Sequence, residues 1–500
     1  MSNKKAIIIG SGVAGLATAI RLAVQGFAVS VYEKNDYPGG KLSAFKKEGF
    51  HFDAGPSLFT QPQNIAALFE LAGEPIADYF IYQPVEIACK YFYENGNIVT
   101  AYTNPEKFGK ELEEKLGELP GAVEKYLSES KKVYDNIGAI FLNHSLHKRK
   151  TWFNRRVLKA LGATKLSYLF KNLHQHNQAR LQTAEAVQLF NRYATYNGSN
   201  PYKAPGMLSL IPHLEYNEGV FYPAGGMISI TNALYELAMK KGVQFHFNTP
   251  VQKIICNEGT ARGIVANNEN ITADIVVSNM DVYFTYKQLL NDSNKAKYVL
   301  KQERSSSALV FYWGIKTTFE QLQLHNIFFS EHYKAEFDCL FKTKTLYHDP
   351  TVYINITSKM EARFAPAGKE NWFVMINAPA NTGQDWEAIK LDARKKIIEK
   401  LNRILSVGCG IQTDIESLIE TEEILDPVTI EEKTASYMGS LYGTSSNSKL
   451  AAFLRHPNFT GEVKNLYFCG GSVHPGGGIP LCLKSAQIVS DLIKNTKRAH

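Results

Sequence analysis

Cysteine is sparse in this sequence and lacks the spacing by which it usually builds structure. The 500 residues contain six cysteines, and no two of them form a CxxC pair. Zinc sites and the disulfide frameworks of small secreted domains depend on closely spaced cysteines. We therefore expect reduced thiols, which are typical of the cytoplasm, and neither a zinc site nor a disulfide framework. The six residues are Cys89, Cys256, Cys339, Cys409, Cys469 and Cys482.

A long uninterrupted apolar run is also missing. The stretch from Ala6 to Ile20 is uncharged, but it has only 15 residues, three glycines interrupt it and Arg21 ends it. A membrane-spanning helix needs about 20 residues. Lys4 and Lys5 precede this stretch as in a secretory signal, yet cleavage there would remove a glycine motif that has a better explanation. We therefore expect a soluble or peripheral protein.

Charge of one sign is in only slight excess. Lysine and arginine number 55 against 48 aspartates and glutamates, which gives a net charge of +7. This charge permits attraction to an anionic surface but does not by itself indicate nucleic acid. The 13 histidines include no HExxH pattern, and His174 and His176 are two positions apart, which places them on different faces of a helix. We therefore expect no metal site.

What is present is the composition of a globular protein. Hydrophobic residues make up 44% of the chain and charged residues 21%, as in ordinary folded domains. Because one core rarely supports 500 residues, we expect two domains, which can be interleaved. The 28 phenylalanines and 26 tyrosines fit a large apolar interior or a ligand tunnel, although a packed core better explains any single ring.

Periodicity and glycine punctuation predict several elements. Residues 5–33 are typical of one β-α-β unit, and PEKFGKELEEKL and VEKYLSESKKVYDNI are typical of amphipathic helices. ISITNALYELAMKK predicts a further helix, and β-rich sequence follows it from Val243 to Ser278. A strand in NLYFCGG and a helix beginning near Pro480 come last.

The motif GSGVAG predicts a dinucleotide site. Gly10 permits a tight turn, Gly12 lets a pyrophosphate approach the backbone, and Gly15 allows close packing of helix on strand. The phosphate would lie at the positive end of the following helix. Glu33 ends the next strand, 18 residues after Gly15, where it can accept hydrogen bonds from ribose hydroxyls. The alternative is a merely structural turn.

The residues that follow favour FAD over NAD. Gly39, Gly40 and Lys41 come soon after Glu33 and supply open backbone and a cation, and DAGPS adds a second turn of close approach. An NAD domain typically continues with further alternating strands and helices, which this chain does not show. We therefore expect FAD as the cofactor.

Three glycine turns, at 10–15, 223–226 and 470–478, each join an extended segment to a helix. They predict one nucleotide-binding domain that is assembled from distant parts of the chain. We assign the FAD-binding domain to residues 1–85, 211–284 and 431–500, a substrate or membrane-facing region to 86–210, and a substrate domain to 285–430.

Taken together, the motifs resemble those of the bacterial-type carotenoid (phytoene) desaturase family. GSGVAG, Glu33, GGK, FDAGPS, GVFYPAGGM and NLYFCGGSVHPGGGIPLCLKSAQ occur in the family's order over the whole chain. The wider superfamily includes amine oxidases and Rab escort proteins. The resemblance implies an α/β fold, in which a Rossmann-type FAD-binding domain of the glutathione-reductase-like and amine-oxidase-like superfamily is interleaved with a mixed α+β substrate domain.

The resemblance also implies a set of FAD-binding residues. It places the ADP half of FAD against Gly10, Gly12, Gly15 and Glu33, the adenine near Val251 and Asn279, and the pyrophosphate near Gly470 and Gly471. It places the flavin near Ser57, Leu58, Leu441, Gly478 and Ile479, Lys41 near the phosphates or the ribityl chain, and Gly40 beside Lys41 and close to the cofactor. Two positions depart from the family: Lys41 stands where many members have arginine, and Ser472 where many flavoproteins have aspartate.

The activity implied is removal of two hydrogens from adjacent carbons of a long apolar polyene, with hydride transfer to flavin N5. The stretch NRYATYNGSNPYKAPGMLSLIPHLEYNEGVFYPAGGM resembles the 1-hydroxycarotenoid 3,4-desaturase branch, and a phytoene or diapophytoene desaturase is the alternative. A flavin amine oxidase and a non-catalytic lipid-binding escort protein are the alternatives from other classes. No acid or base is assigned, and His474 either touches substrate or caps backbone groups.

The segment between Asp135 and Glu185 has no acidic residue and mixes basic with aromatic and aliphatic side chains. This pattern is typical of an interfacial membrane contact, and a solvated face is the alternative. Nothing else in the sequence supports a nucleic-acid surface. We therefore expect a cytoplasmic protein that associates peripherally with the inner face of the cell membrane. No oligomeric state is predicted.

Overall fold

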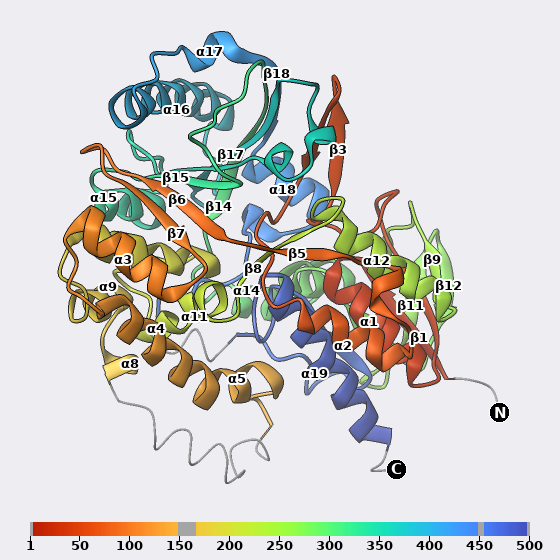
Figure 1. The fold of residues 1–500 in the computed structure, drawn as a ribbon. Coiled ribbons are helices and arrows are strands. Elements are labelled where there is room, and N and C mark those ends of the chain that lie inside the picture. Colours follow the sequence, from red (N-terminus) through yellow and green to blue (C-terminus); the bar gives the residue numbers. More distant parts are fainter. Residues whose placement is uncertain (1–3, 149–166, 449–454, 498–500) are drawn as a thin grey trace.

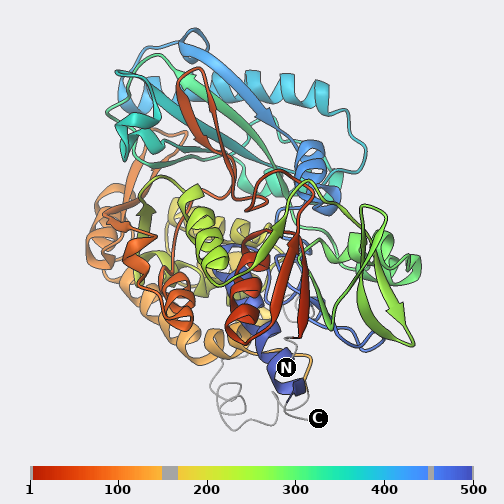
Figure 2. The same cartoon turned by 90° about the vertical axis from the view of Figure 1, so that its right-hand side faces the viewer.

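The computed structural model describes residues 4–148, 167–448 and 455–497. A seven-stranded sheet with its helix forms the upper part of the molecule in Figures 1 and 2, and a five-stranded sheet with its helices lies below it. No helix of the described residues is both long and apolar enough to cross a membrane.

The five-stranded sheet is parallel and draws its strands from distant parts of the chain. Its order is β19-β13-β1-β2-β9. Strands of a parallel sheet are buried on both faces and therefore consist of nearly continuous apolar residues, as in KAIII and IVVS. The bounds are β1 Lys5–Ile9, β2 Ala28–Tyr32, β9 Gln244–His246, β13 Ile275–Ser278 and β19 Leu466–Phe468.

Helices cover one face of this sheet and a small antiparallel sheet covers the other. Helix α1, Val13–Val24, packs against α2, Gln63–Ala72, α12, Ile228–Lys240, and α19, Ile479–Lys497, around one apolar core. The β-α-β unit predicted for residues 5–33 is confirmed by β1, α1 and β2. The other face carries β10 Val251–Asn257, β11 Thr260–Ala266, β12 Glu269–Thr272, α13 Val282–Phe284 and α14 Ser293–Val299.

The seven-stranded sheet has the order β18-β14-β17-β16-β15-β6-β7. Its pairs are antiparallel except β15 with β6. That parallel pair joins the segments 86–210 and 285–430, which are far apart in sequence, into one sheet. The bounds are β6 Ile87–Phe92, β7 Ile98–Tyr102, β14 Ser307–Ile315, β15 His325–Phe328, β16 Val352–Asn355, β17 Glu370–Ala378 and β18 Ile419–Leu425.

Helix α16, Trp386–Cys409, packs on one face of this sheet, and a layer of short helices lies beside β6 and β7. Helix α3 shows why these helices begin and end where they do. Asn104 accepts a hydrogen bond from the N–H of Lys107 and Pro105 starts the helix, while Gly117 ends it with a φ of 72°. The layer contains α3 Pro105–Leu116, α4 Ala122–Val133, α9 Leu173–Gln178, α10 Ala184–Asn191 and α11 Pro212–Tyr216, with the 3₁₀ helix η3 Arg192–Asn197.

The remaining helices and strands are short. Two further sheets are antiparallel pairs of strands, β3 Ala44–Lys47 with β4 Phe50–Asp53, and β5 Tyr82–Val85 with β8 Val220–Pro223. The other α-helices are α5 Ala139–Asn143, α8 Ser167–Phe170, α15 Tyr333–Asp338, α17 Ile415–Leu418 and α18 Pro427–Thr434.

Candidate functional site

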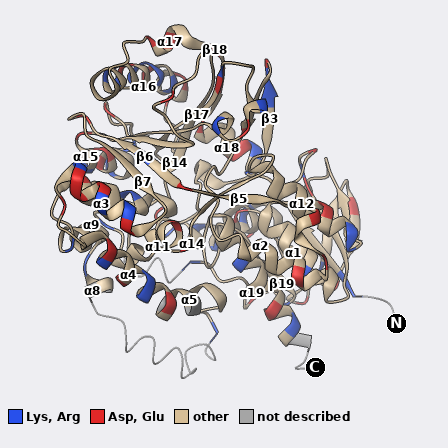
Figure 3. Cartoon of the chain, in the orientation of Figure 1, with Lys and Arg blue, Asp and Glu red and all other residues tan. Residues whose placement is uncertain are grey.

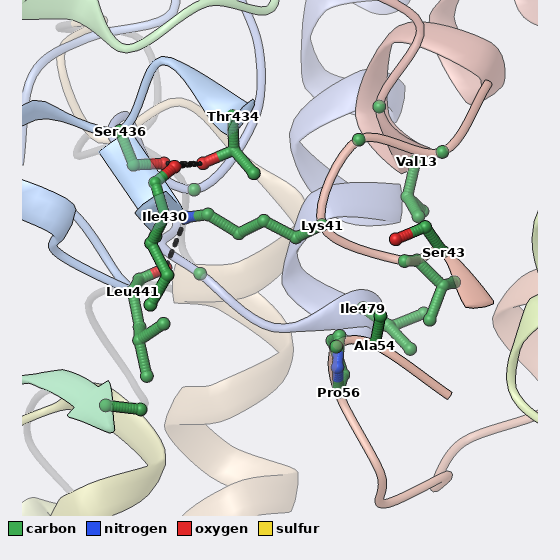
Figure 4. Close-up of a pocket in the computed structure, with 18 of the residues that line it drawn as sticks. Val13, Lys41, Ser43, Ala54, Pro56, Ile430, Thr434, Ser436, Leu441 and Ile479 are labelled. Carbon is green, nitrogen blue, oxygen red and sulfur yellow. Dashed lines mark hydrogen bonds between the residues drawn. The ribbon is translucent and has the colours of Figure 1, made fainter. Parts of the chain in front are cut away.

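One large cavity lies between the two sheets. Its volume is about 1330 Å³, which exceeds the roughly 300–1,000 Å³ of a pocket for one small ligand. All the predicted FAD-binding residues except Gly15 line it: Gly10, Gly12, Glu33, Gly40, Lys41, Ser57, Leu58, Val251, Asn279, Leu441, Gly470, Gly471, Gly478 and Ile479. Figure 4 shows part of this lining, with Lys41 reaching across towards Leu441.

The turn between β1 and α1 gives the cavity a floor of bare backbone. Gly10 has a φ of 91°, and a Cβ on Gly12 would lie 2.7 Å from Nδ2 of Asn279. Gly15 lies inside α1, where a Cβ would approach the carbonyl oxygen of Gly10 to 2.2 Å. Gly15 therefore serves the packing of the helix on the turn, and Gly12 permits close packing against Asn279 while the backbone of Gly10 and Gly12 lines the cavity.

Asn279 is the residue around which these glycines gather. Its backbone N–H donates to the carbonyl oxygen of Ile9 at the end of β1, and its side chain is the nearest neighbour of a Cβ built on Gly10, Gly12 or Gly470. The carboxyl ends of β1, β13 and β19 meet here. In open α/β sheets, ligands bind at this edge, where the strand order reverses.

Glu33 is held firmly beside the glycine turn. Its side chain accepts hydrogen bonds from the backbone N–H of Ser11 at 2.8 Å, the hydroxyl of Ser11 at 2.9 Å and the N–H of Asn35 at 3.0 Å. The residue is only 6% exposed and lines the cavity. A carboxylate has about four acceptor positions, so Glu33 retains the capacity to accept from a ribose hydroxyl.

Lys41 connects the first glycine segment to a distant loop. Its ammonium donates to the carbonyl oxygen of Leu441 at 3.0 Å and to that of Ser440 at 3.4 Å. Burial lowers the pKa of Lys41 to about 8, an effect that nearby Asp281 partly opposes. A cation in this position can meet the phosphates of a dinucleotide.

The last glycine turn, at 470–478, also lines the cavity. Gly478 has a φ of 105° and leads into α19 at Ile479, so the positive end of that helix meets the cavity. In Figure 4, Ile479 lies next to Ala54 and Pro56 of the DAGPS turn. The hydroxyl of Ser472 accepts a hydrogen bond from the N–H of Val282 at 3.1 Å.

His474 faces away from this cavity. Its Nε2 donates to the carbonyl oxygen of His144 at 3.0 Å, and burial lowers its pKa to about 4. The side chain is 2% exposed and does not line the cavity. Of the two alternatives left by the sequence, the structure supports the capping of backbone groups.

A second group of polar residues lines the cavity where it meets the seven-stranded sheet, and sequence reasoning missed it. The Arg192 guanidinium donates to the Tyr91 hydroxyl at 2.7 Å and lies 3.3 Å from a Glu215 carboxylate oxygen. Glu215 also accepts from the hydroxyls of Tyr193 and Tyr196. We call Arg192, Glu215 and Tyr196 the charged wall. No local motif distinguishes these residues, because their partners lie on other elements.

Among the described residues, no three His, Cys, Asp or Glu side chains are grouped so that they could hold a metal ion. All six cysteines lie in the described part of the chain and are free. Residues 149–166 of the basic and aromatic segment predicted as a membrane contact lie outside the described residues.

Comparison with known proteins agrees with this geometry. A family model described as flavin containing amine oxidoreductase matches residues 13–297. The chain is 51% identical to a 1-hydroxycarotenoid 3,4-desaturase from Flavobacterium sp. (strain P99-3) over 493 residues, 99% of each chain. It is 35% identical to a 4,4'-diapolycopene oxygenase from Methylomonas sp over 505 residues, 98% of each. The solved structure of cyclohexylamine oxidase from Brevibacterium oxydans IH-35A has a TM-score of 0.61 at 15% identity, covering 99% of this chain and all of the other.

Proposed function

Because the chain belongs to the family of flavin-containing amine oxidoreductases and is an FAD-dependent oxidoreductase, we propose that it desaturates a 1-hydroxycarotenoid at the 3,4 bond. The observation that carries this proposal is the composition of the large cavity between the two sheets. The glycine turns with Glu33 form one part, and apolar residues of the seven-stranded sheet, such as Val310, Ile327 and Met375, form another. A long polyene and a dinucleotide cofactor both need such space.

The residues present fit FAD at this site. Gly12 and Gly470 line the cavity with bare backbone packed against Asn279, nothing lies within 4 Å of a Cβ built on Gly478, and Glu33 offers acceptor capacity in the same lining. Gly12, Glu33 and Lys41 would hold the ADP and phosphate part, and Ser57 and Ile479 would lie by the ring. When bound, FAD supplies the hydride acceptor.

The protein's contribution to the reaction is position and electrostatics. The N-terminus of α19 presents its positive end to the cavity, where it would stabilise negative charge on a bound cofactor. Apolar side chains around the polyene exclude water from the reacting carbons. Loss of a hydride from one carbon would leave positive charge that delocalises along the conjugated chain and makes the adjacent C–H acidic. A weak acceptor, such as the Glu215 carboxylate that lines the cavity, would then take that proton as the double bond forms, so a strong base is not required of the protein.

The proposal is tested by identifying the product. The protein is expressed in a host that accumulates a 1-hydroxycarotenoid, and the pigments are separated and analysed by mass spectrometry and absorption spectroscopy. We expect a product that has lost two hydrogens and whose absorption has moved to longer wavelength. Parallel assays use phytoene, a diapophytoene, an acyclic polyene without hydroxyl, and amines.

Each other outcome overturns the proposal in a specific way. Action on phytoene or diapophytoene alone would replace the substrate assignment. A product that gains oxygen would place the chain with the oxygenases that it resembles at 35% identity. Oxidation of amines alone would remove the carotenoid assignment altogether. Protein isolated without flavin, with no activity on any of these compounds, would support the escort alternative.

We also propose that the protein is cytoplasmic and contacts the inner face of the cell membrane. The support is the basic and aromatic composition of 135–185 and the apolar character of the proposed substrate. Phe170, which lies in the described part of this segment, is 63% exposed. Figure 3 shows both signs of charge interspersed on α3, α4 and α19. We therefore expect anionic lipid to strengthen binding to the membrane, and we expect binding to depend on apolar contacts as well. Flotation with anionic and with neutral vesicles tests this, and absence of binding to both would contradict it.

A further inference from the structure

His325 stands out among the residues that line the cavity because one of its ring nitrogens has no partner. Its Nδ1 lies 2.7 Å from the hydroxyl of Tyr353 and 3.2 Å from Nδ2 of Asn355. Its Nε2, on the other side of the ring, has no hydrogen-bond partner within 4–148, 167–448 and 455–497. The residue is 3% exposed, lies in β15 and lines the cavity.

The neighbours of Nδ1 determine which nitrogen carries the proton. Asn355 Nδ2 also donates to the carbonyl oxygen of Leu324 at 3.0 Å, which fixes it as the amide nitrogen and hence as a donor towards His325. Nδ1 therefore accepts, and in the neutral ring the proton is on Nε2. His325, which lines the cavity, thus carries an N–H donor on the side of its ring away from Tyr353 and Asn355.

The ring stays neutral at physiological pH. Burial and then the positive charge of Arg192 lower the pKa of His325 to about 3. Because the ring carries no charge, its N–H can donate to a neutral acceptor such as a hydroxyl oxygen and does not require an anion. The cavity lining combines apolar residues, such as Ala308, Val310, Ile327 and Met375, with the polar residues of the charged wall. Leaving a buried donor without an acceptor is costly.

The position of this donor fits the chemistry of a hydroxylated polyene end. The Tyr353 hydroxyl that meets His325 also lies 2.7 Å from the hydroxyl of Ser57, a residue predicted to lie by the flavin. In a 1-hydroxycarotenoid a single carbon, C2, separates the hydroxyl-bearing C1 from C3. A group that binds the hydroxyl must therefore lie close to the ring that oxidises the 3,4 bond.

We propose that His325 Nε2–H donates a hydrogen bond to the tertiary hydroxyl of the substrate and so places the 3,4 bond over the flavin. The charged wall of Arg192, Glu215 and Tyr196 lines the same cavity and provides acceptor atoms for the hydroxyl hydrogen. A hydroxyl both accepts and donates, and the cavity supplies both functions. This inference rests on the proposed 3,4-desaturation.

The experiment compares two substrates on the flavin-loaded enzyme, a 1-hydroxylated polyene and the same polyene without the hydroxyl. The quantity measured is the ratio of their kcat/KM values. In His325→Phe, which keeps an aromatic ring and lacks the donor, we expect this ratio to fall about tenfold or more, chiefly through KM of the hydroxylated substrate. His325→Gln, whose amide retains a donor, should keep much of the ratio.

Controls separate this effect from loss of structure. Met375→Leu alters an apolar residue of the same cavity with little change of volume, and we expect it to affect both substrates alike. His325→Leu repeats the test if the phenylalanine variant does not retain flavin. Flavin absorbance of each purified variant reports whether the fold is intact.

The results for wild type and variants address different claims. If the wild type desaturates neither polyene, the proposed function fails and this inference fails with it. If the wild type desaturates both equally well, desaturation stands and hydroxyl recognition is overturned. If the wild type prefers the hydroxylated substrate and both donor-free variants keep that preference, the hydroxyl is bound elsewhere and the assignment to His325 is wrong.

Discussion

The side chain of Glu33 is bonded to both the backbone and the side chain of Ser11, since the N–H donates at 2.8 Å and the hydroxyl at 2.9 Å. Ser11 lies between Gly10 and Gly12, the two glycines of the turn that line the cavity. The acid that can bind a ribose therefore also fixes the turn that can bind a pyrophosphate. The two parts of the proposed ADP site are thus joined by these hydrogen bonds.

Glu33→Ala should weaken FAD binding about 10- to 100-fold. The change removes an ionised acceptor, and hydrogen bonds to charged groups contribute about 1.5–3 kcal/mol. The measurement is the dissociation constant of FAD from titration of the flavin-free protein. Ser11→Ala, which loses one hydroxyl and keeps the backbone bond, should cost less. Equal affinity in Glu33→Ala and wild type would show that the acid does not meet the ribose.

Lys41 should make the flavin-free protein more stable as the pH rises through about 8 to 10. Its pKa is lowered to about 8 by burial, so in this window the unfolded chain binds a proton that the folded chain does not. Denaturant midpoints of wild type at pH 7.5 and 10 would show the gain, and Lys41→Met should lack it. An identical pH dependence in the two proteins would contradict the assignment.

If the Lys41 ammonium meets FAD phosphate, FAD affinity should fall over a range above pH 8. The phosphate favours the charged form and moves the transition upward, so the loss begins later in the complex than in the free protein. Lys41→Arg keeps its charge throughout this range and should bind FAD with little pH dependence. Titration of each flavin-free protein at several pH values measures the difference.

Gly15→Ala should destabilise the protein by about 1–3 kcal/mol, the usual cost of overpacking. Its Cβ would approach the Gly10 carbonyl oxygen to 2.2 Å, so the helix or the turn must move. Gly461→Ala is the matched control, because nothing lies within 4 Å of its Cβ and its φ is not positive. Urea unfolding measures both, and similar midpoints for the two variants would be inconsistent with tight packing at Gly15.

Asp281→Ala should cost about 3–5 kcal/mol, because it leaves a buried guanidinium unpaired. The Arg304 Nη2 lies 2.5 Å from Asp281 Oδ2, and the side chains are 5% and 4% exposed. Replacing both residues, as in Asp281→Ala with Arg304→Met, should recover part of the loss. A double-mutant cycle in urea measures the coupling, and strictly additive effects would indicate that the pair is not coupled.

The parts of the fold that depend on local sequence were predictable. The helix predicted over PEKFGKELEEKL is α3, Pro105–Leu116, and ISITNALYELAMKK contains α12, Ile228–Lys240. The helix predicted near Pro480 begins at Ile479. Turns and helix ends are set by neighbouring residues, such as Asn104 at the start of α3 and the glycine that ends it. Of the three glycine turns grouped by their shared strand–turn–helix context, those at 10–15 and 470–478 contribute residues to one cavity, whereas the turn at 223–226 does not line it.

Features that depend on pairing across the chain were not predictable. Nothing in the sequence around Tyr91 indicates that β6 pairs in parallel with β15. Arg192 and Glu215 are ordinary charged residues in sequence, and only folding brings them together in a buried cluster. In the sequence, nothing distinguishes His325 from other strand residues. Its tautomer is determined by Tyr353 and Asn355, which lie on the neighbouring strand of the sheet.

The order of the five-stranded sheet has a consequence for biosynthesis. β1 begins at Lys5, but its neighbour β13 pairs on the other side with β19, which begins at Leu466. The turn at 470–478 and the start of α19 follow that strand. A ribosome must therefore have made nearly the whole chain before the nucleotide pocket can close. Cofactor loading is in this sense a late step, and a nascent chain that stalls before residue 466 exposes an unpaired edge of β13 to chaperones and proteases.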